Sequence, residues 1–247
     1  MLPSLVRNLN ASANFGTFAR LLLDSNRRPR VLVVGGRTLG AGMDAILENP
    51  TIELVETDLS LGPRTQVICD ANDLPFADET FDGAVAQAIL DDVPDPARCV
   101  DELHRVLNKT GVVYAETPFL YPVHDAAYDF VRFTHLGHRW LFRRFEEISS
   151  GPVAGPATAL ACVFEGFLVA CFETRLLRTM ARVSARLAAF WLKYLDHYLI
   201  TKSGAFDCSI GYFFMGKKSD EPLSSGRLTS LYRGWRRPGE TGKAKRV

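Results

Sequence analysis

The sequence lacks several patterns that define common classes of protein. Its five cysteines show no C-x-x-C spacing and predict neither a zinc site nor a disulfide framework. Positive and negative charges leave a formal net charge of only +1, so bulk electrostatic binding of nucleic acid is not expected. Residues 1–23 do not combine a charged start with a sustained apolar core, as a signal peptide would. These absences favour a cytoplasmic protein with reduced cysteines, no metal ion and no nucleic-acid partner.

Long uninterrupted apolar runs are also missing. The most apolar stretch, residues 157–172, is short for a membrane span and contains Glu165. Residues 173–199 continue as an amphipathic helical pattern with a basic face. Such a helix lies on an anionic membrane or packs against its own domain or a partner subunit, so peripheral membrane contact through residues 157–200 and a homo-oligomer both stay open. The basic face consists of Arg175, Arg178, Arg182 and Arg186.

Two familiar nucleotide motifs are absent from the glycine-rich segment 35–42. The dinucleotide pattern G-x-G-x-x-G fails because Arg37 replaces its second glycine, and no Gly-Lys-Ser/Thr follows to form a phosphate-binding loop. What is present is an apolar run at residues 31–34, the glycine turn, and a helical pattern at residues 43–47. Glycine lets the backbone approach a ligand, and a helix start offers free N–H groups. The segment therefore predicts a cofactor site that departs from the dinucleotide pattern.

Acidic residues follow the next two predicted strands. Asp58 ends the strand at residues 52–57, and Asp70 follows the strand at residues 67–69. An acid about 20 residues beyond the glycine turn can accept hydrogen bonds from ribose hydroxyls. Each aspartate alone is more typical of a turn or a helix cap. Their order and spacing together favour a cofactor site, with Gln87 joining them at the carboxyl edge of a parallel sheet.

Residues 30–118 resemble the class I S-adenosylmethionine-dependent methyltransferases, through the D-A-x-x-L-P-F block that begins at Asp70 and the F-D pair at Phe81. In that family the glycine turn holds the methionine part of S-adenosyl-L-methionine, the acid after the second strand binds the ribose, and the acid-plus-small pair after the third strand borders the adenine. This chain departs from the family at Arg37 and at Val33, where an acid commonly precedes the glycines. The resemblance implies a cofactor site made of Gly35, Gly36, Gly40, Asp58, Leu59, Asp70, Ala71 and Gln87.

A second informative segment spans residues 114–135 and follows a predicted strand. In a doubly wound sheet this position lies at the rim of the cofactor site, where His124, Asp129, Arg132 and aromatic residues suit a small polar substrate. A hydroxyl nucleophile must lose its proton, and a histidine oriented by a carboxylate can take it. These three residues are the catalytic candidates, with His124 and Asp129 first. The alternative is a structural loop in which the same side chains only pair with one another.

The alternation of strands and helices indicates an α/β fold, a doubly wound Rossmann-like sheet that is mostly parallel with an antiparallel last strand, plus a helical insertion. Glycine and proline clusters mark the change to the insertion, and an aromatic-rich segment predicts the closing strand. The expected segments are an N-terminal helical segment at 1–29, a cofactor-binding core at 30–150, a helical insertion or cap at 151–204, the closing strand at 205–216 and a flexible basic tail at 217–247.

These observations favour an S-adenosyl-L-methionine-dependent methyltransferase that acts on a small-molecule or a sugar- or lipid-linked acceptor, at oxygen. Two alternatives stay open. A non-catalytic cofactor-binding or scaffold protein of the same fold is favoured by Arg37 and Val33. A nicotinamide-dependent reductase is disfavoured by the missing second glycine.

Overall fold

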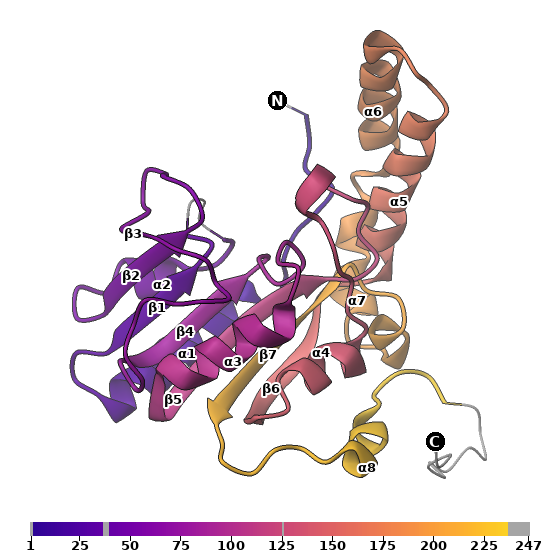
Figure 1. Cartoon of the computed structure of the whole chain (residues 1–247). Helices are drawn as coiled ribbons and strands as arrows, with labels where there is room; N and C mark the ends of the chain where they lie inside the picture. The colour runs from indigo at the N-terminus through magenta and orange to yellow at the C-terminus, as the bar shows by residue number, and fades with distance from the viewer. Residues whose placement is uncertain (1, 37–39, 125, 237–247) are drawn as a thin grey trace.

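The computed structural model describes residues 2–36, 40–124 and 126–236. A seven-stranded sheet lies at its centre, in the order β3-β2-β1-β4-β5-β7-β6 (Figure 1). Strands β1 to β5 pair in parallel, whereas β7 pairs antiparallel with both β5 and β6. This arrangement confirms the predicted fold class. The strands are β1 Arg30–Val34, β2 Glu53–Asp58, β3 Val67–Ile68, β4 Phe81–Gln87, β5 Leu107–Pro118, β6 Phe145–Ala154 and β7 Gly211–Lys218.

Strand β1 is buried on both faces of the sheet. Val31 packs in a cluster with Phe15 and Phe18 of helix α1, whereas Leu32, its neighbour in sequence, packs in a second cluster with Leu103 of helix α3. Successive side chains of a strand point to opposite faces, so a strand covered on both sides is continuously apolar. The helices are α1 Ala11–Ser25, α2 Asp44–Leu47, α3 Pro96–Val106, α4 His135–Leu141, α5 Pro156–Ala170, α6 Arg175–Ala189, α7 Asp196–Leu199 and α8 Ser225–Leu228.

The register of the central strands brings their carboxyl ends to one edge of the sheet. Val34, the last residue of β1, pairs with Thr57 of β2 and with Ala86 of β4, and Gln87 pairs with Glu116 of β5. Ligands of open α/β sheets bind at this edge.

The helical insertion lies between β6 and β7 and differs in detail from the expectation. Helices α5 and α6 form a hairpin that projects away from the sheet (Figure 1). The single amphipathic helix expected over residues 173–199 ends at Ala189, and the chain then turns through two short helices. The turn brings the fully buried carboxylate of Asp196 to the start of α5, where it accepts hydrogen bonds from the backbone N–H groups of Gly155, Ala157 and Thr158 at 3.0, 3.0 and 2.8 Å.

The closing strand begins later than expected. Residues 203–206 form a 3₁₀ turn, and β7 starts only at Gly211. Just before it, the buried hydroxyl of Ser209 lies 2.7 Å from the carbonyl oxygens of both Ala154 and Gly211, so the chain is held out of the ladder at that point. Strand β6 also continues four residues beyond the expected core boundary at residue 150, to Ala154.

Residues 217–236 differ from a flexible tail. Strand β7 includes residues up to Lys218, and the following chain folds back over β6. Arg233 donates hydrogen bonds to the Glu147 carboxylate at 2.6 Å and to the Ser150 carbonyl at 2.9 Å, and Trp235 N donates to the Asp207 carboxylate at 2.7 Å. The partners in these contacts lie 28 to 86 residues away in the sequence, so the composition of the segment does not reveal them. The rest of the expected tail, residues 237–247, lies outside the described residues.

None of the helices in the described part of the chain is both long enough and apolar enough to span a membrane.

Candidate active site

The glycine turn follows β1 and contacts the end of β2. Gly35 has a φ of +75°, in the left-handed region that favours glycine, and the N–H of Gly36 donates to the Thr57 carbonyl at 2.9 Å. A Cβ on Gly36 would lie 3.0 Å from the Cβ of Glu56, so there is little space for a side chain. Arg37, which breaks the dinucleotide pattern, lies outside the described residues.

Gly40 faces the side chain that ends β4. A Cβ at this position would lie only 1.6 Å from the Oε1 atom of Gln87, so no side chain fits here unless Gln87 moves. The amide of Gln87 is fixed from its other end, because Nε2 donates to the Glu116 carboxylate at 2.8 Å and to the Ala41 carbonyl at 3.2 Å. Its Oε1 atom is buried and has no hydrogen-bond partner among the described residues.

A cavity of about 420 Å³ opens at this edge of the sheet. Four of the predicted site residues line it, namely Gly35, Gly40, Gln87 and His124. They come from three separate parts of the chain, and only the strand order brings them together. The same wall includes Asn8, Glu116, Thr117 and Tyr121, which the sequence did not single out.

Glu116 is the central hydrogen-bond acceptor of that wall. Asn8 Nδ2 donates hydrogen bonds to both oxygens of its buried carboxylate, at 2.9 and 3.0 Å. The same carboxylate also accepts hydrogen bonds from the amide of Gln87 and the hydroxyl of Tyr114. Burial raises the pKa of Glu116 above its usual range, and the three donors oppose that shift. Sequence reasoning missed it because Asn8 and Glu116 are 108 residues apart, and its only local signal was an acid at a strand end.

The two predicted ribose and adenine contacts lie at the same sheet edge but outside the wall of this cavity. Asp58 accepts hydrogen bonds from the N–H and hydroxyl of Ser60 at 3.0 and 3.1 Å, and Asp70 accepts one from Asn72 N at 2.8 Å. Both carboxylates therefore also shape their own turns. Leu59 is 62% exposed, whereas Ala71 is buried in the core.

His124 lies between two carboxylates. Its Nδ1 atom is 3.2 Å from Asp129 Oδ2, and its Nε2 atom is 3.6 Å from Asp91 Oδ2. The guanidinium of Arg132 binds both oxygens of Asp129 and holds the pKa of that carboxyl below its usual range. The three predicted catalytic residues thus form one connected group, in which Arg132 fixes Asp129 and Asp129 fixes the ring.

Asp91 is the acid of this group that the sequence reasoning did not select. It is fully buried, and neither carboxylate oxygen has a hydrogen-bond partner among the described residues. Burial, assisted by the neighbouring charge of Asp92, raises the pKa of Asp91 to about 6. The available signal was the pair of adjacent acids, Asp91 and Asp92, shortly after a predicted strand.

Asp91, Asp92 and His124 could together hold a metal ion, since each offers one ligand atom and these atoms lie within 4.8 Å of one another. Among the described residues this is the one such group. The Nε2 atom of His124 cannot bind a cation and accept a proton at the same time, so the two uses of this group exclude each other.

Two further histidines near this segment, His135 and His138, are buried in the core. Burial lowers the pKa of His135 to about 4 and that of His138 to about 3, so both rings are neutral at physiological pH. His138 packs edge-on against Phe142 and Phe214. Neither ring lines the cavity at the glycine turn.

Comparison with known proteins assigns the central region. A family described as a methyltransferase domain matches residues 44–115, which run from α2 into β5. Residues 44–115 therefore belong to a methyltransferase domain. The family predicted from the sequence is thereby confirmed.

Two curated relatives match parts of this methyltransferase domain. The ubiquinone/menaquinone biosynthesis C-methyltransferase UbiE of Desulfotalea psychrophila is 40% identical over 68 residues, 27% of this chain and 26% of that protein. The phosphatidylethanolamine N-methyltransferase of Cereibacter sphaeroides is 50% identical over 44 residues, 18% of this chain and 22% of that protein. The match therefore spans about a quarter of each relative.

Solved structures share the fold over most of the chain. An O-methyltransferase of a trans-AT PKS multienzyme from Brevibacillus brevis, in complex with S-adenosyl-L-homocysteine, superposes with a TM-score of 0.52 at 14% identity, covering 88% of this chain and 76% of that one. A proposed sarcosine dimethylglycine methyltransferase from Galdieria sulphuraria also gives 0.52, at 15% identity, covering 84% and 83%. At such identities the similarity shows the shared fold.

Proposed function

We propose that the chain transfers a methyl group from S-adenosyl-L-methionine to an oxygen atom of a small-molecule or a sugar- or lipid-linked acceptor. The observation that carries this proposal is the position of His124. It lines the same cavity as Gly35, Gly40 and Gln87, and its ring nitrogens lie 3.2 Å from Asp129 and 3.6 Å from Asp91. A proton acceptor fixed beside a cofactor cavity suits methylation of a hydroxyl group.

The residues at the sheet edge fit this cofactor. Gly35, Gly40 and Gln87 line the cavity there, and the two glycines leave their part of the wall without side chains. We assign Gly35, Gly36, Gly40 and Gln87 to the methionine part, Asp58 with Leu59 to the ribose, and Asp70 with Ala71 to the adenine. When bound, S-adenosyl-L-methionine supplies an electrophilic methyl group on a sulfonium sulfur.

His124 is assigned as the general base. The Asp129 carboxylate, kept ionised by Arg132, lies 3.2 Å from Nδ1 and favours the tautomer with the proton on that nitrogen, which leaves Nε2 as the basic nitrogen. When Nε2 takes the proton of an acceptor hydroxyl, the Asp91 carboxylate at 3.6 Å stabilises the resulting positive charge on the ring. Arg132 and Asp129 are positioning residues, because they act on the acceptor through the ring.

Holding the acceptor in line is the other task of the site. Good orientation in a dry cavity supplies about 7–11 kcal/mol of the barrier reduction in a two-reactant step. The relatives support methyl transfer as the reaction, but they include both a C-methyltransferase and an N-methyltransferase. The assignment to oxygen therefore rests on the base at His124.

Residues 157–200 support peripheral membrane contact as part of this proposal. The hairpin of α5 and α6 projects from the sheet (Figure 1) and carries large apolar side chains in solvent, including Phe167 at 64%, Leu176 at 71% and Met180 at 57% exposure. Apolar side chains next to arginines suit the interface of an anionic bilayer.

Calorimetry and transfer of a labelled methyl group test the function together. S-adenosyl-L-homocysteine is titrated into the wild type, into Asp58→Ala and into the control Asp101→Ala, which removes an exposed carboxylate from α3. We expect binding that Asp58→Ala weakens about tenfold or more and Asp101→Ala leaves unchanged. Absence of heat with the wild type would favour the scaffold alternative.

Labelled S-adenosyl-L-methionine is then incubated with fractions of a cell extract. We expect His124→Gln to lower methyl transfer by about 10²–10⁴-fold while S-adenosyl-L-homocysteine still binds. Chelation of metal ions with EDTA leaves the rate unchanged if Nε2 of His124 is the base. Full turnover of His124→Gln would remove the base assignment without affecting the cofactor assignment.

A further inference from the structure

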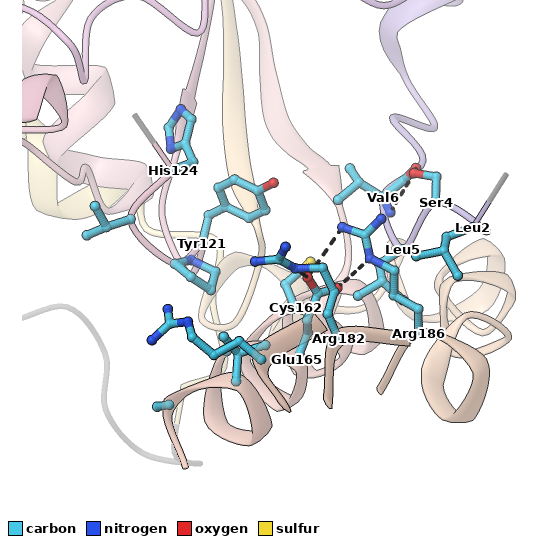
Figure 2. A pocket seen from close by; sticks show the side chains of 16 residues that line it. Leu2, Ser4, Leu5, Val6, Tyr121, His124, Cys162, Glu165, Arg182 and Arg186 are labelled. Atoms are coloured by element: carbon cyan, nitrogen blue, oxygen red, sulfur yellow. Dashed lines mark hydrogen bonds and ion pairs between the residues drawn. The ribbon is translucent and has the colours of Figure 1, made fainter. Parts of the chain in front are cut away.

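A second cavity, of about 710 Å³, lies between the α5–α6 hairpin and the N-terminal segment (Figure 2). Its walls come from residues 2–6, from the loop 121–124 after β5, and from one side of each hairpin helix. The methyltransferase assignment does not use this cavity.

One wall of this second cavity is strongly basic. Arg178, Arg182 and Arg186 of α6 line it and follow one another at four-residue intervals, which places them about 6 Å apart along the helix. The Glu165 carboxylate of α5 pairs with Arg186 at 2.7 Å and with Arg182 at 3.3 Å (Figure 2). Three guanidinium groups and one carboxylate leave a net charge of about +2 on the lining. Arg178 pairs with no carboxylate in the part of the chain that the structure describes.

The remaining walls are mostly apolar. Leu5 and Val169 are buried there at 6% and 8% exposure, whereas Leu2 and Val6 are 39% and 37% exposed. Figure 2 shows Leu2, Leu5 and Val6 on the N-terminal segment. A ligand for this space needs an anionic group for one wall and an apolar part for the other.

The two cavities meet at the proposed base. Val6, Tyr121 and His124 line both of them, so a molecule held by the arginines extends towards the methyl-transfer site. The arginine-lined cavity and the cavity at the glycine turn thus adjoin at His124, which borders both.

We propose that the second cavity binds the methyl acceptor, and that this acceptor is an amphiphile with a phosphate monoester group held by the arginines and a hydroxyl group that reaches His124. A phosphate monoester carries about −1.5 to −2 charges at neutral pH, which matches the net charge of the lining. Arginine binds phosphate oxygens through paired N–H groups, and the apolar wall takes the chain. This inference rests on the proposed function, because the position of the base, His124, defines which group of the bound acceptor receives the methyl group.

Calorimetry on the full-length protein with soluble phosphates tests the assignment. The probe is dihexanoyl phosphatidic acid, compared with glycerol 3-phosphate, which has the head group but no chains, and with dihexanoyl phosphatidylcholine, which has the chains but no net charge. We expect saturable binding of the phosphatidic acid and binding at least about tenfold weaker for the other two. Equal affinity for glycerol 3-phosphate would overturn the requirement for an apolar part.

Arginine variants locate the binding. Arg178→Gln, and separately Arg178→Gln with Arg182→Gln, are compared with Arg175→Gln, which removes the same charge from the same helix but does not line the cavity. Loss of the paired contacts lowers affinity for phosphatidic acid by about 10- to 100-fold. Arg175→Gln leaves it within about twofold, as expected for a single exposed surface charge. An equal loss in Arg175→Gln would overturn the cavity assignment in favour of general surface charge.

S-adenosyl-L-homocysteine binding to the same samples separates this inference from the proposed function. We expect it to be unchanged in every arginine variant, which also shows that they remain folded. If the cofactor product binds but phosphatidic acid does not, the acceptor class is wrong and the methyltransferase proposal stands. If phosphatidic acid binds but the cofactor product does not, the proposed function fails and the second cavity loses its role as an acceptor site.

Discussion

The Nε2 atom of His124 lies 3.6 Å from the Oδ2 atom of Asp91, a carboxylate that is fully buried. The pair connects the loop after β4 with the loop after β5, and His124 also lines the cavity at the glycine turn. A buried acid whose pKa is raised to about 6 costs stability whenever it is ionised, and such costs gather at functional sites.

Asp91→Asn tests this cost through the pH dependence of stability. The folded-state pKa of about 6 lies above the usual aspartate value of 3.8, so the native state binds the proton more tightly and its stability falls as the pH rises from about 4 to about 6. Asparagine removes the ionisation, so we expect the free energy of unfolding to rise by about 1–3 kcal/mol at pH 8 and to gain nothing from this source at pH 4.

Chemical denaturation at both pH values measures the effect, with Asp101→Asn as the exposed control. Methyl transfer falls in Asp91→Asn even though the protein is more stable. If Asp91→Asn were less stable than the wild type at pH 8, ionised Asp91 would not be a source of instability and the prediction would be wrong.

Gly40→Ala tests the contact between the glycine turn and Gln87. Because the new Cβ would lie 1.6 Å from Gln87 Oε1, the amide must move and lose its bonds to Glu116 and Ala41. We expect S-adenosyl-L-homocysteine to bind about tenfold or more weakly, as for the loss of one to two hydrogen bonds.

The matched control is Gly16→Ala, on helix α1, where a Cβ meets nothing within 4 Å. This variant keeps full affinity and gains up to about 1 kcal/mol of stability, because alanine favours the helix interior. Unchanged binding in Gly40→Ala would show that the turn does not contact the cofactor.

Asp196→Ala tests what holds the hairpin to the sheet. The substitution leaves the N–H groups of Gly155, Ala157 and Thr158 without their acceptor at the start of α5. Loss of a capping carboxylate in a buried setting costs roughly 2–4 kcal/mol.

Hydrogen exchange detects this loss residue by residue. We expect faster exchange in residues 155–170 and little change in β1 and β4. If the whole sheet exchanged faster to the same extent, the hairpin would be part of one cooperative unit with the core instead of a separately held cap.

Flotation with vesicles tests membrane contact through the hairpin. We expect the full-length protein to float with vesicles that contain phosphatidylglycerol and to float less with neutral phosphatidylcholine vesicles. Phe167→Ser with Leu176→Ser removes two exposed apolar side chains and lowers the bound fraction, since each is worth about 1.5–3 kcal/mol when buried.

Tyr128→Ser, at a 63% exposed aromatic residue outside the hairpin, is the control and floats like the wild type. Sedimentation of the free protein accompanies the assay. A stable dimer that the double substitution dissociates would instead assign the apolar face to a second copy of the chain.

The local pattern was sufficient for much of the fold and for part of the site. The continuous apolar run of β1 predicted a strand buried on both faces, and the glycine turn with Gln87 predicted one wall of the cavity. The loop that carries His124, Asp129 and Arg132 was recognised because three side chains of complementary chemistry lie within nine positions. Asp91 and Glu116 were missed, because their importance comes from burial and from partners far along the chain.

The sequence by itself determined the alternation of strands and helices, the position of the glycine turn and the acids that follow successive strands. These features follow from side-chain period and backbone preference, which act over a few residues. Tertiary structure alone decided that Asp91 faces His124, that Asn8 reaches Glu116, and that α6 stops so that Asp196 can cap α5. Such contacts depend on which parts of the chain are buried against one another in the folded protein, and a local sequence pattern does not reveal this.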